Sequence, residues 1–174
     1  MSIFSGADET SGSRTSLYIA PGKYISRINA IKTGQTRKKR DFVVIETSCL
    51  AVIREDNDSQ TGQPCSNRAG TSPSHMIMMD SDTGLPNVIA AVRDICGVND
   101  DEVTEAKLTQ ISSDAQPLQG WIVVINAIEI TTRSGSPFTK VDYQGLAKVR
   151  DLELAGISPE DLNEDDTLFE HQES

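Results

Sequence analysis

The sequence predicts a mainly β domain with one helical insert, and three observations carry this prediction. Two long segments, residues 41–54 and 120–133, are rich in β-branched and aromatic side chains and contain no proline, which favours strands. Residues 85–96 instead repeat their apolar side chains at helical spacing. Stretches rich in Gly, Pro, Ser and Asp separate these segments and indicate turns.

The first half of the chain contains three predicted strands. Residues 23–32 carry apolar side chains on both faces and form the first, which ends in a turn at Thr33-Gly34-Gln35. Residues 41–54 form the second and clearest strand. A polar loop over residues 55–72 leads to a short apolar strand at 74–79.

The helical insert follows the third strand. Pro86 suits the first turn of a helix over residues 85–96, and Gly97 stands where a C-terminal cap belongs. Asn99 is predicted to cap a second helix that runs to about Ile111.

Residues 120–133 and 138–143 complete the domain as a hairpin across a turn at 134–137. The resulting order, three strands, a helical insert and a hairpin, is typical of a five-stranded, partly open barrel of the OB (oligonucleotide/oligosaccharide-binding) type. A β-sandwich with a helical insertion is the alternative that periodicity leaves open.

The two ends of the chain differ in composition from this domain, which spans residues 17–150. Residues 1–16 are rich in Ser, Gly and Thr and are predicted to be a disordered leader, and residues 151–174 a disordered acidic tail. No apolar run approaches the roughly 20 residues of a membrane span, and the leader lacks the pattern of a signal peptide. We therefore expect a soluble, cytoplasmic protein with no membrane partner.

Charge is divided unevenly along the chain. The formal net charge is −10, but residues 151–174 hold nine acids and no Lys or Arg, which leaves 17 acids against 16 bases elsewhere. Residues 20–40 carry seven bases and no acid: Lys23, Arg27, Lys32, Arg37, Lys38, Lys39 and Arg40. Because a phosphate backbone relieves the repulsion among such cations, we predict that this segment binds nucleic acid. The alternative is a solvated loop that only aids solubility.

The last predicted hairpin supplies a second nucleic-acid contact. Arg133 and Lys140 flank its turn, with Phe138 and Tyr143 beside them. An exposed ring between cations can stack on a base while the cations hold phosphates. We expect at least one of these two rings to be buried in the core.

Catalysis is not predicted. The sequence has no glycine-rich phosphate loop, nucleophile elbow or metal-binding histidine pair, so we expect no enzyme activity, no cofactor and no metal. A metal enzyme would require Asp80, Asp82 and Asp142 to converge in space. The cysteines have no zinc-site spacing and are expected to be free thiols: Cys49, Cys65 and Cys96.

The acidic tail contains apolar residues among its charges, namely Leu162, Leu168 and Phe169. This pattern is typical of a peptide that docks onto partner proteins. The tail can also lie in the basic groove of its own protein and compete with nucleic acid, by charge complementarity. The alternative is a tail that serves only to solvate the chain.

The succession of segments over roughly residues 20–145, followed by the acidic tail, resembles bacteriophage single-stranded DNA-binding proteins. The matching segments are GKYISRINAIK, TRKKRDFVVIETSCL, DSDTGLPNVIAAVRDICGV, GWIVVINAIEI and TTRSGSPFTKVDYQG. The resemblance implies an OB fold and sequence-independent binding of single-stranded DNA in phage DNA replication and recombination, in the host cytoplasm. It also implies that the tail contacts replication or recombination proteins and limits binding.

The main alternative is a non-catalytic virion or assembly protein, a protein–protein interaction module whose sheet edges and acidic tail engage other subunits. The sequence leaves open whether the protein forms a homo-oligomer and whether it prefers DNA or RNA.

Overall fold

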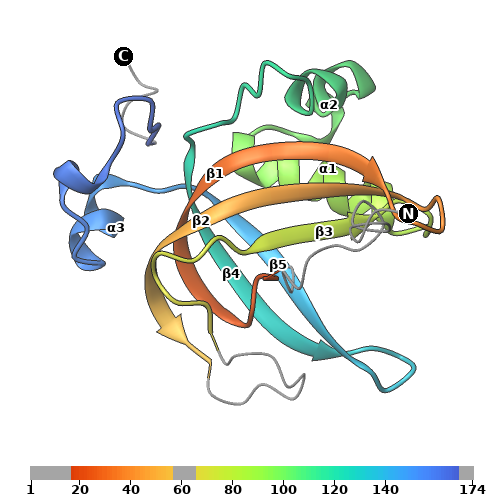
Figure 1. Ribbon diagram of the computed structural model, residues 1–174, viewed down its shortest axis with the longest axis horizontal. Coiled ribbons are helices and arrows are strands. Elements are labelled where there is room, and N and C mark those ends of the chain that lie inside the picture. Colours follow the sequence, from red (N-terminus) through yellow and green to blue (C-terminus); the bar gives the residue numbers. More distant parts are fainter. Residues whose placement is uncertain (1–16, 57–65, 169–174) are drawn as a thin grey trace, which may run out of the picture.

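A computed structural model describes residues 17–56 and 66–168 of the 174-residue chain. The predicted leader, the middle of the polar loop with Cys65, and the last six residues with Phe169 lie outside the described residues. The described chain is mainly β: a five-stranded antiparallel sheet with order β3-β2-β1-β4-β5, which does not close, accompanied by α1, α2 and α3 (Figure 1).

The strands lie where the sequence predicts them. They are β1 (Gly22–Gln35), β2 (Asp41–Glu55), β3 (Ser74–Met78), β4 (Ile122–Thr131) and β5 (Pro137–Leu146). All five belong to one sheet, so the β-sandwich alternative is wrong. The predicted turn at Thr33-Gly34-Gln35 is also wrong, because β1 continues through it to Gln35.

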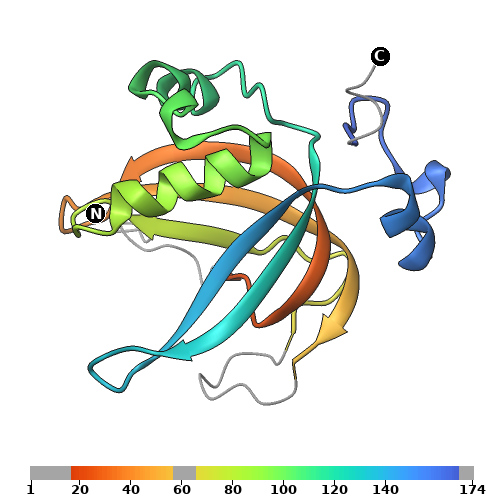
Figure 2. The ribbon, with the colours of Figure 1, turned by 180° about the vertical axis from the view of Figure 1, so that it is seen from behind.

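The pairing of β1 with β2 sets the curvature of the sheet. Three register shifts interrupt this pair, between Lys23 and Tyr24, Ile25 and Ser26, and Ile28 and Ala30. Such bulges bend and twist a strand pair locally. The bent sheet therefore has an inner face and an outer face (Figures 1 and 2).

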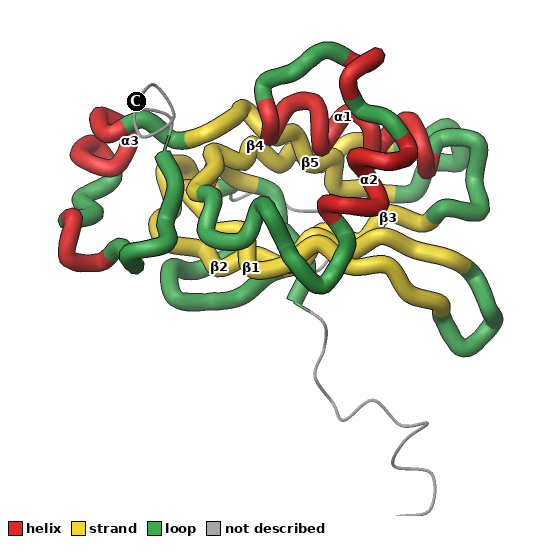
Figure 3. Tube along the Cα trace, turned by 90° about the horizontal axis from the view of Figure 1, so that it is seen from above, coloured by secondary structure: helices red, strands yellow, loops and turns green. Residues whose placement is uncertain are grey.

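The inner face of the sheet packs against α1 (Gly84–Cys96) in the main hydrophobic core. Ile28, Ile45 and Ile125 from the sheet meet Val92 and Ile95 from α1 there, each at most 2% exposed. The predicted C-terminal cap is confirmed, because Gly97 adopts the left-handed conformation with φ 66°. Figure 3 shows α1 and α2 lying together on one side of the strands.

The predicted second helix is broken in two. A 3₁₀ turn at Asp100–Glu102 follows Asn99, and α2 then runs from Glu105 to Ile111 with Thr104 as its cap. The Thr104 side chain accepts a hydrogen bond from the Lys107 amide. Val103 lies between the two turns and is 6% exposed. Burying this side chain in the main core thus accompanies the break between Asn99 and α2.

A second, smaller core lies on the outer face of the sheet. Ile25 of β1 and Ile122 and Val124 of β4 pack there against Leu152 and Leu168 from the C-terminal segment. The segment contains α3 (Val149–Leu154) and a 3₁₀ turn at Pro159–Asp161. Hence the expectation of disorder over residues 151–168 is wrong: that part of the acidic tail covers apolar strand residues.

The C-terminal segment is also hydrogen-bonded to the start of β4. The Ile122 amide donates to the Thr167 carbonyl at 2.9 Å, and the Thr167 amide donates to the Gly120 carbonyl at 2.8 Å. Gly120 has φ +86°, and a Cβ there would stand 2.5 Å from the Asp165 carbonyl oxygen. Only glycine permits this close approach.

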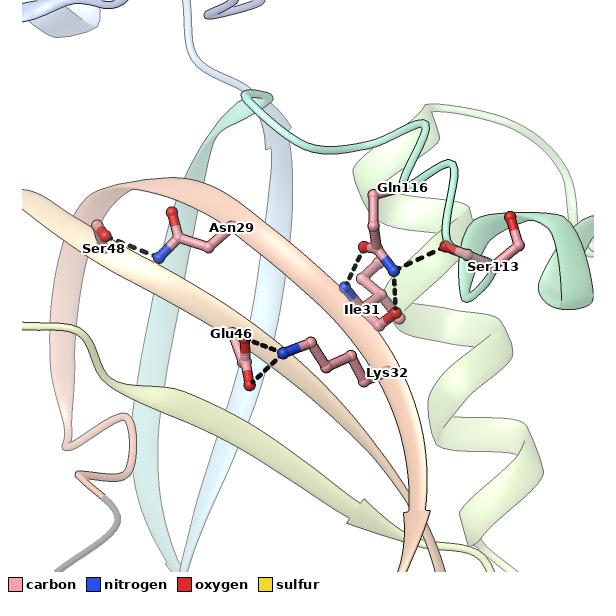
Figure 4. A network of polar contacts seen from close by, with 7 residues as sticks. All are labelled: Asn29, Ile31, Lys32, Glu46, Ser48, Ser113 and Gln116. Carbon is pink, nitrogen blue, oxygen red and sulfur yellow. Dashed lines mark hydrogen bonds and ion pairs between the residues drawn. The ribbon is translucent and has the colours of Figure 1, made fainter. Parts of the chain in front are cut away.

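β1 pairs with β4 only from Gly22 to Arg27. Further along β1, the Gln116 side chain forms hydrogen bonds with the backbone groups of Ile31 (Figure 4). The Gln116 amide oxygen accepts from the Ile31 amide at 2.7 Å, and its nitrogen donates to the Ile31 carbonyl at 2.8 Å. The same nitrogen donates to the Ser113 carbonyl at 2.9 Å. Gln116 holds this position with φ +43°, a left-handed conformation that costs energy in a residue with a Cβ.

We expect Gln116→Ala to lower the free energy of unfolding by about 2 kcal/mol, because it leaves both Ile31 backbone groups without their partner. Gln116→Gly removes the same hydrogen bonds but relieves the left-handed backbone, so it should cost about 1 kcal/mol less than the alanine variant. Urea unfolding measures both. Gln119→Ala, at an exposed neighbour, is the control, and equal losses in all three variants would contradict this account.

Candidate nucleic-acid interface

The basic cluster forms the turn between β1 and β2. The Lys39 amide donates to the Thr36 carbonyl at 2.8 Å, and the Thr36 amide donates to the Arg40 carbonyl at 2.9 Å. Lys39 adopts φ +58° within this turn. The tight turn leaves Arg37, Lys38 and Lys39 exposed, and among the described residues these three cations make no ion pair.

The fourth cation of the turn is partly neutralised. The Arg40 guanidinium pairs with the Asp80 carboxylate at 2.5 Å, and this hydrogen bond lowers the pKa of Asp80 below its usual value. Both side chains are exposed, so the pair orients Arg40 without removing it from solvent.

The seven predicted cations do not form one continuous face. Lys32 on β1 pairs with Glu46 on β2 at 3.2 Å (Figure 4). Arg27 pairs with Asp166 at 2.7 Å through two hydrogen bonds. Lys23 lies near the start of β1, opposite Arg54, far along the strand from the turn. The free positive charge is therefore concentrated at the tip of the β1–β2 hairpin.

The register of the sheet reveals an apolar surface that the sequence analysis missed. Val43 and Ile45 point to the inner core, so their neighbours Phe42 and Val44 lie on the outer face. Across β3, Phe42 pairs with Met78 and Val44 with Met76. These four side chains are half-buried and lie beside the basic turn.

The ring of Phe42 packs against Gly34 of β1. A Cβ at Gly34 would stand 2.7 Å from the Phe42 ring, so the glycine is what admits the ring at this position. Burial alternates along β2, but residues 42–45 are all apolar, so the sequence carried no signal for which of them faces outward.

The second hairpin places one of its two predicted rings on the surface. Phe138 is 51% exposed, whereas Tyr143 is 3% exposed and belongs to the main core. Tyr143 therefore cannot stack on a base. This confirms the expectation that at least one of these two rings is buried. Arg133 is exposed in the turn, and Lys140 pairs with Asp142 at 3.7 Å.

Both hairpin tips lie at the same end of the molecule (Figures 1 and 2). The β1–β2 tip presents three free cations, and the β4–β5 tip presents Arg133 with Phe138 nearby. The acidic C-terminal segment with α3 lies at the opposite end. The fold thus separates the free cations from most of the acidic charge.

The predicted docking residues of the tail are only partly available. Leu168 is 2% exposed, and Leu162 packs against the same outer core, so neither is a free anchor for a partner. Asp166 is buried as well: its carboxylate binds Arg27 and accepts from the Asn163 amide at 2.7 Å. The segment folds back onto its own protein.

The carboxylates proposed for a metal enzyme do not converge. Among residues 17–56 and 66–168, no group of three or more His, Cys, Asp or Glu side chains is arranged to hold a metal ion. Cys49 and Cys96 are free thiols. Burial raises the pKa of the Cys49 thiol to about 11, so this thiol is unreactive at neutral pH.

Comparison of the sequence with models of known protein families and with curated proteins finds no match. Within the described part of the chain, no helix is long and apolar enough to span a membrane.

A buried polar pair joins the two edge strands of the sheet. The Tyr143 hydroxyl on β5 lies 3.1 Å from His75 Nδ1 on β3. Burial raises the pKa of Tyr143, so its hydroxyl stays protonated. Among the described residues Nδ1 is the only hydrogen-bond partner of this hydroxyl, so we assign the hydroxyl as the donor. Burial also lowers the pKa of His75 to about 4, so the imidazole is neutral at physiological pH and accepts at Nδ1.

The His75 pair predicts a loss of stability in mild acid. The folded-state pKa lies below the unfolded value of about 6.5, so the unfolded chain takes up the proton first and stability falls as pH drops from about 6.5 towards 4. Between about pH 7.5 and 5.5 the wild type should lose roughly 1 kcal/mol more than His75→Gln, which accepts from Tyr143 but does not titrate. Urea unfolding at both pH values measures this, and an identical pH dependence would refute the assignment.

Proposed function

We propose that this protein binds single-stranded DNA without sequence specificity and without catalysis, through an OB-type barrel. The strand order β3-β2-β1-β4-β5, with a helix between β3 and β4, supports this architecture. OB-type domains bind oligonucleotides across strands 2 and 3, between the 1–2 loop and the 4–5 loop. The resemblance of the sequence to phage single-stranded DNA-binding proteins of replication and recombination supports the same function.

The observation that carries the proposal is the position of the free cations relative to two accessible rings, the half-buried Phe42 and the exposed Phe138. Arg37, Lys38 and Lys39 form the 1–2 turn, and Phe42 lies beside them on the strand 2–3 surface. Arg133 and Phe138 belong to the 4–5 hairpin at the same end of the molecule. Cations that hold phosphates beside rings that stack on bases are what binding without sequence preference requires.

The distribution of charge explains how a protein of net charge −10 can bind a polyanion. The exposed acids of the C-terminal segment lie at the end opposite the hairpin tips (Figure 2). At physiological salt, exposed charges interact over about 8 Å, so distant acids repel a bound strand only weakly. The electrostatic attraction between the DNA and the nearby cations of the basic turn therefore governs DNA binding.

The C-terminal segment acts on this surface through Arg27. In our proposal Asp166 occupies a cation that would otherwise extend the phosphate track along β1, and the tail thereby limits affinity. This contact differs from a mobile tail that lies over the whole groove, because Leu152 and Leu168 anchor the segment in the outer core. Deleting residues 151–174 would uncover Ile25, Ile122 and Val124, so a deletion is a poor test of this idea.

A protein partner is a second candidate, favoured by a hollow of about 480 Å³ in the C-terminal segment. Its floor is formed by Leu152, Ile157 and Leu162, and Glu153 and Glu164 contribute acidic groups to its lining. Apolar and acidic surface together suit a basic peptide with apolar anchors. Recruitment of a replication or recombination protein by this hollow is compatible with DNA binding at the other end.

The proposed function predicts a salt-dependent affinity that depends on the basic turn. Replacing the three free cations (Arg37→Gln, Lys38→Gln, Lys39→Asn) should make the negative slope of log K against log salt shallower by about 2, because each phosphate contact on a single strand contributes about −0.7. Fluorescence anisotropy of a labelled oligonucleotide at several salt concentrations measures the slope.

The matched control removes three cations elsewhere, Arg68→Gln, Lys107→Gln and Arg150→Gln, and should keep the slope within about one contact of the wild type. Binding by the wild type that ignores salt, or equal changes in the two triple variants, would reject the proposed interface.

The role of the tail predicts that Asp166→Asn raises DNA affinity severalfold, because it frees the Arg27 guanidinium for one more phosphate contact. Asp165→Asn removes one negative charge from the neighbouring exposed residue and is the control. A larger gain in affinity for Asp166→Asn than for Asp165→Asn is then due to the loss of the Arg27–Asp166 ion pair. The same anisotropy titration measures both, with thermal unfolding as a check on folding. Equal affinities of the two variants would show that the pair is purely structural.

A further inference from the structure

The two edge strands, β3 and β5, are separated by a cleft of about 260 Å³. One wall comes from β5, with Phe138 and Thr139. The other comes from β3, with His75, and from the segment before β1, with Tyr18. Tyr18 is 43% exposed and Phe138 is 51% exposed, so two large rings border one narrow opening.

The Tyr18 side of the cleft is held in place by hydrogen bonds. The Ile19 amide donates to the Ser74 carbonyl at 3.1 Å, and the Ser74 amide donates to the Leu17 carbonyl at 2.7 Å. The Asn67 side chain, which is 3% exposed as a residue, donates to the Tyr18 carbonyl at 3.0 Å. Because these contacts fix the backbone on both sides of Tyr18, the wall is formed before any ligand binds.

His75 offers one oriented donor to the cleft. The Tyr143 hydroxyl occupies Nδ1, which leaves the imidazole hydrogen on Nε2. Nε2 makes no hydrogen bond to the described residues, and among the described side chains no fully buried nitrogen or oxygen lacks a partner. Nε2 is therefore not fully buried, and since His75 lines the cleft, it can meet a ligand there.

A peptide strand is a poor occupant for this cleft. Strand addition uses the free backbone groups of a sheet edge. At Ser74 that edge of β3 already pairs with the segment containing Tyr18. Flat rings beside a single donor instead suit a planar ligand with a carbonyl acceptor, and thymine, cytosine and guanine have that chemistry.

We propose that this cleft takes one nucleobase of the bound strand, stacked on Phe138 and Tyr18, with a ring carbonyl oxygen accepting from His75 Nε2. The inference rests on the proposed function and adds a base-binding subsite to it. The cations of the β1–β2 turn hold the backbone, and the cleft holds a base, so the two contributions are separable by experiment.

The test compares two labelled oligonucleotides, one of thymidines and one of the same length with every base removed, each longer than the 4–16 or so nucleotides that one OB-type domain covers. Phe138→Ala and Tyr18→Ala should each bind the thymidine strand at least about fivefold more weakly than wild type. Both should bind the abasic strand as the wild type does, with an unchanged salt slope. Phe138→Tyr and Tyr18→Phe keep the rings and should retain affinity.

Ile53→Ala is the matched control, because Ile53 is 46% exposed near the far end of β2 and does not line the cleft. Thermal unfolding of each variant verifies the fold. Unchanged affinity of the alanine variants for thymidine, or an equal loss on the abasic strand, overturns the inference and leaves the proposed function standing. Failure of the wild type to bind either strand overturns both.

Discussion

The structure depends on β1, a strand whose first half is apolar on both faces. Tyr24 and Ile28 point into the main core, whereas Ile25 points to the outer face. A sheet with one solvated face cannot bury Ile25, so a second layer is required there. The C-terminal segment supplies it, and the burial of Leu152 and Leu168 against Ile25 explains why part of an acidic tail is ordered.

The same constraint determines where the proposed DNA-binding surface lies. Because the C-terminal segment covers the outer face near Ile25, the free part of that face is the other half of β1 and β2, beyond Arg27. Phe42 and Val44 lie on this free half, next to the basic turn. The acid that ends the covered half, Asp166, pairs with Arg27 at the boundary. The Arg27–Asp166 ion pair thus both holds the C-terminal segment on the sheet and forms the contact through which we propose that the tail limits binding.

The backbone N–H and C=O groups at the edges of the open sheet also need hydrogen-bond partners. Gln116 substitutes for a strand along β1, the Leu17–Ile19 segment pairs with Ser74, and the His75–Tyr143 contact links β3 to β5. Each device uses side chains or a short segment in place of a full strand, which prevents a long exposed edge. The space left between β3 and β5 is the cleft that we assign to a nucleobase.

The sequence by itself determined the strands, the first helix with its Gly97 cap, and the segregation of charge, because these are local properties of periodicity and composition. It could not predict the break in the second helix at Val103, since the burial of this side chain in the main core is a tertiary contact. Nor could it place Phe42 on the surface and Tyr143 inside, because both lie in strands and only the register assigns each residue to a face.

Only the tertiary structure decided the role of the acidic tail. Its composition predicts disorder, but residues 151–168 are ordered against the apolar outer face, which is formed by Ile25 of β1 together with Ile122 and Val124 of β4. The seven predicted cations were likewise divided by pairing. Arg27, Lys32 and Arg40 have carboxylate partners, whereas among the described residues Lys23, Arg37, Lys38 and Lys39 have none. Which cations are paired depends on contacts between different strands and segments of the chain, and sequence periodicity does not encode these contacts.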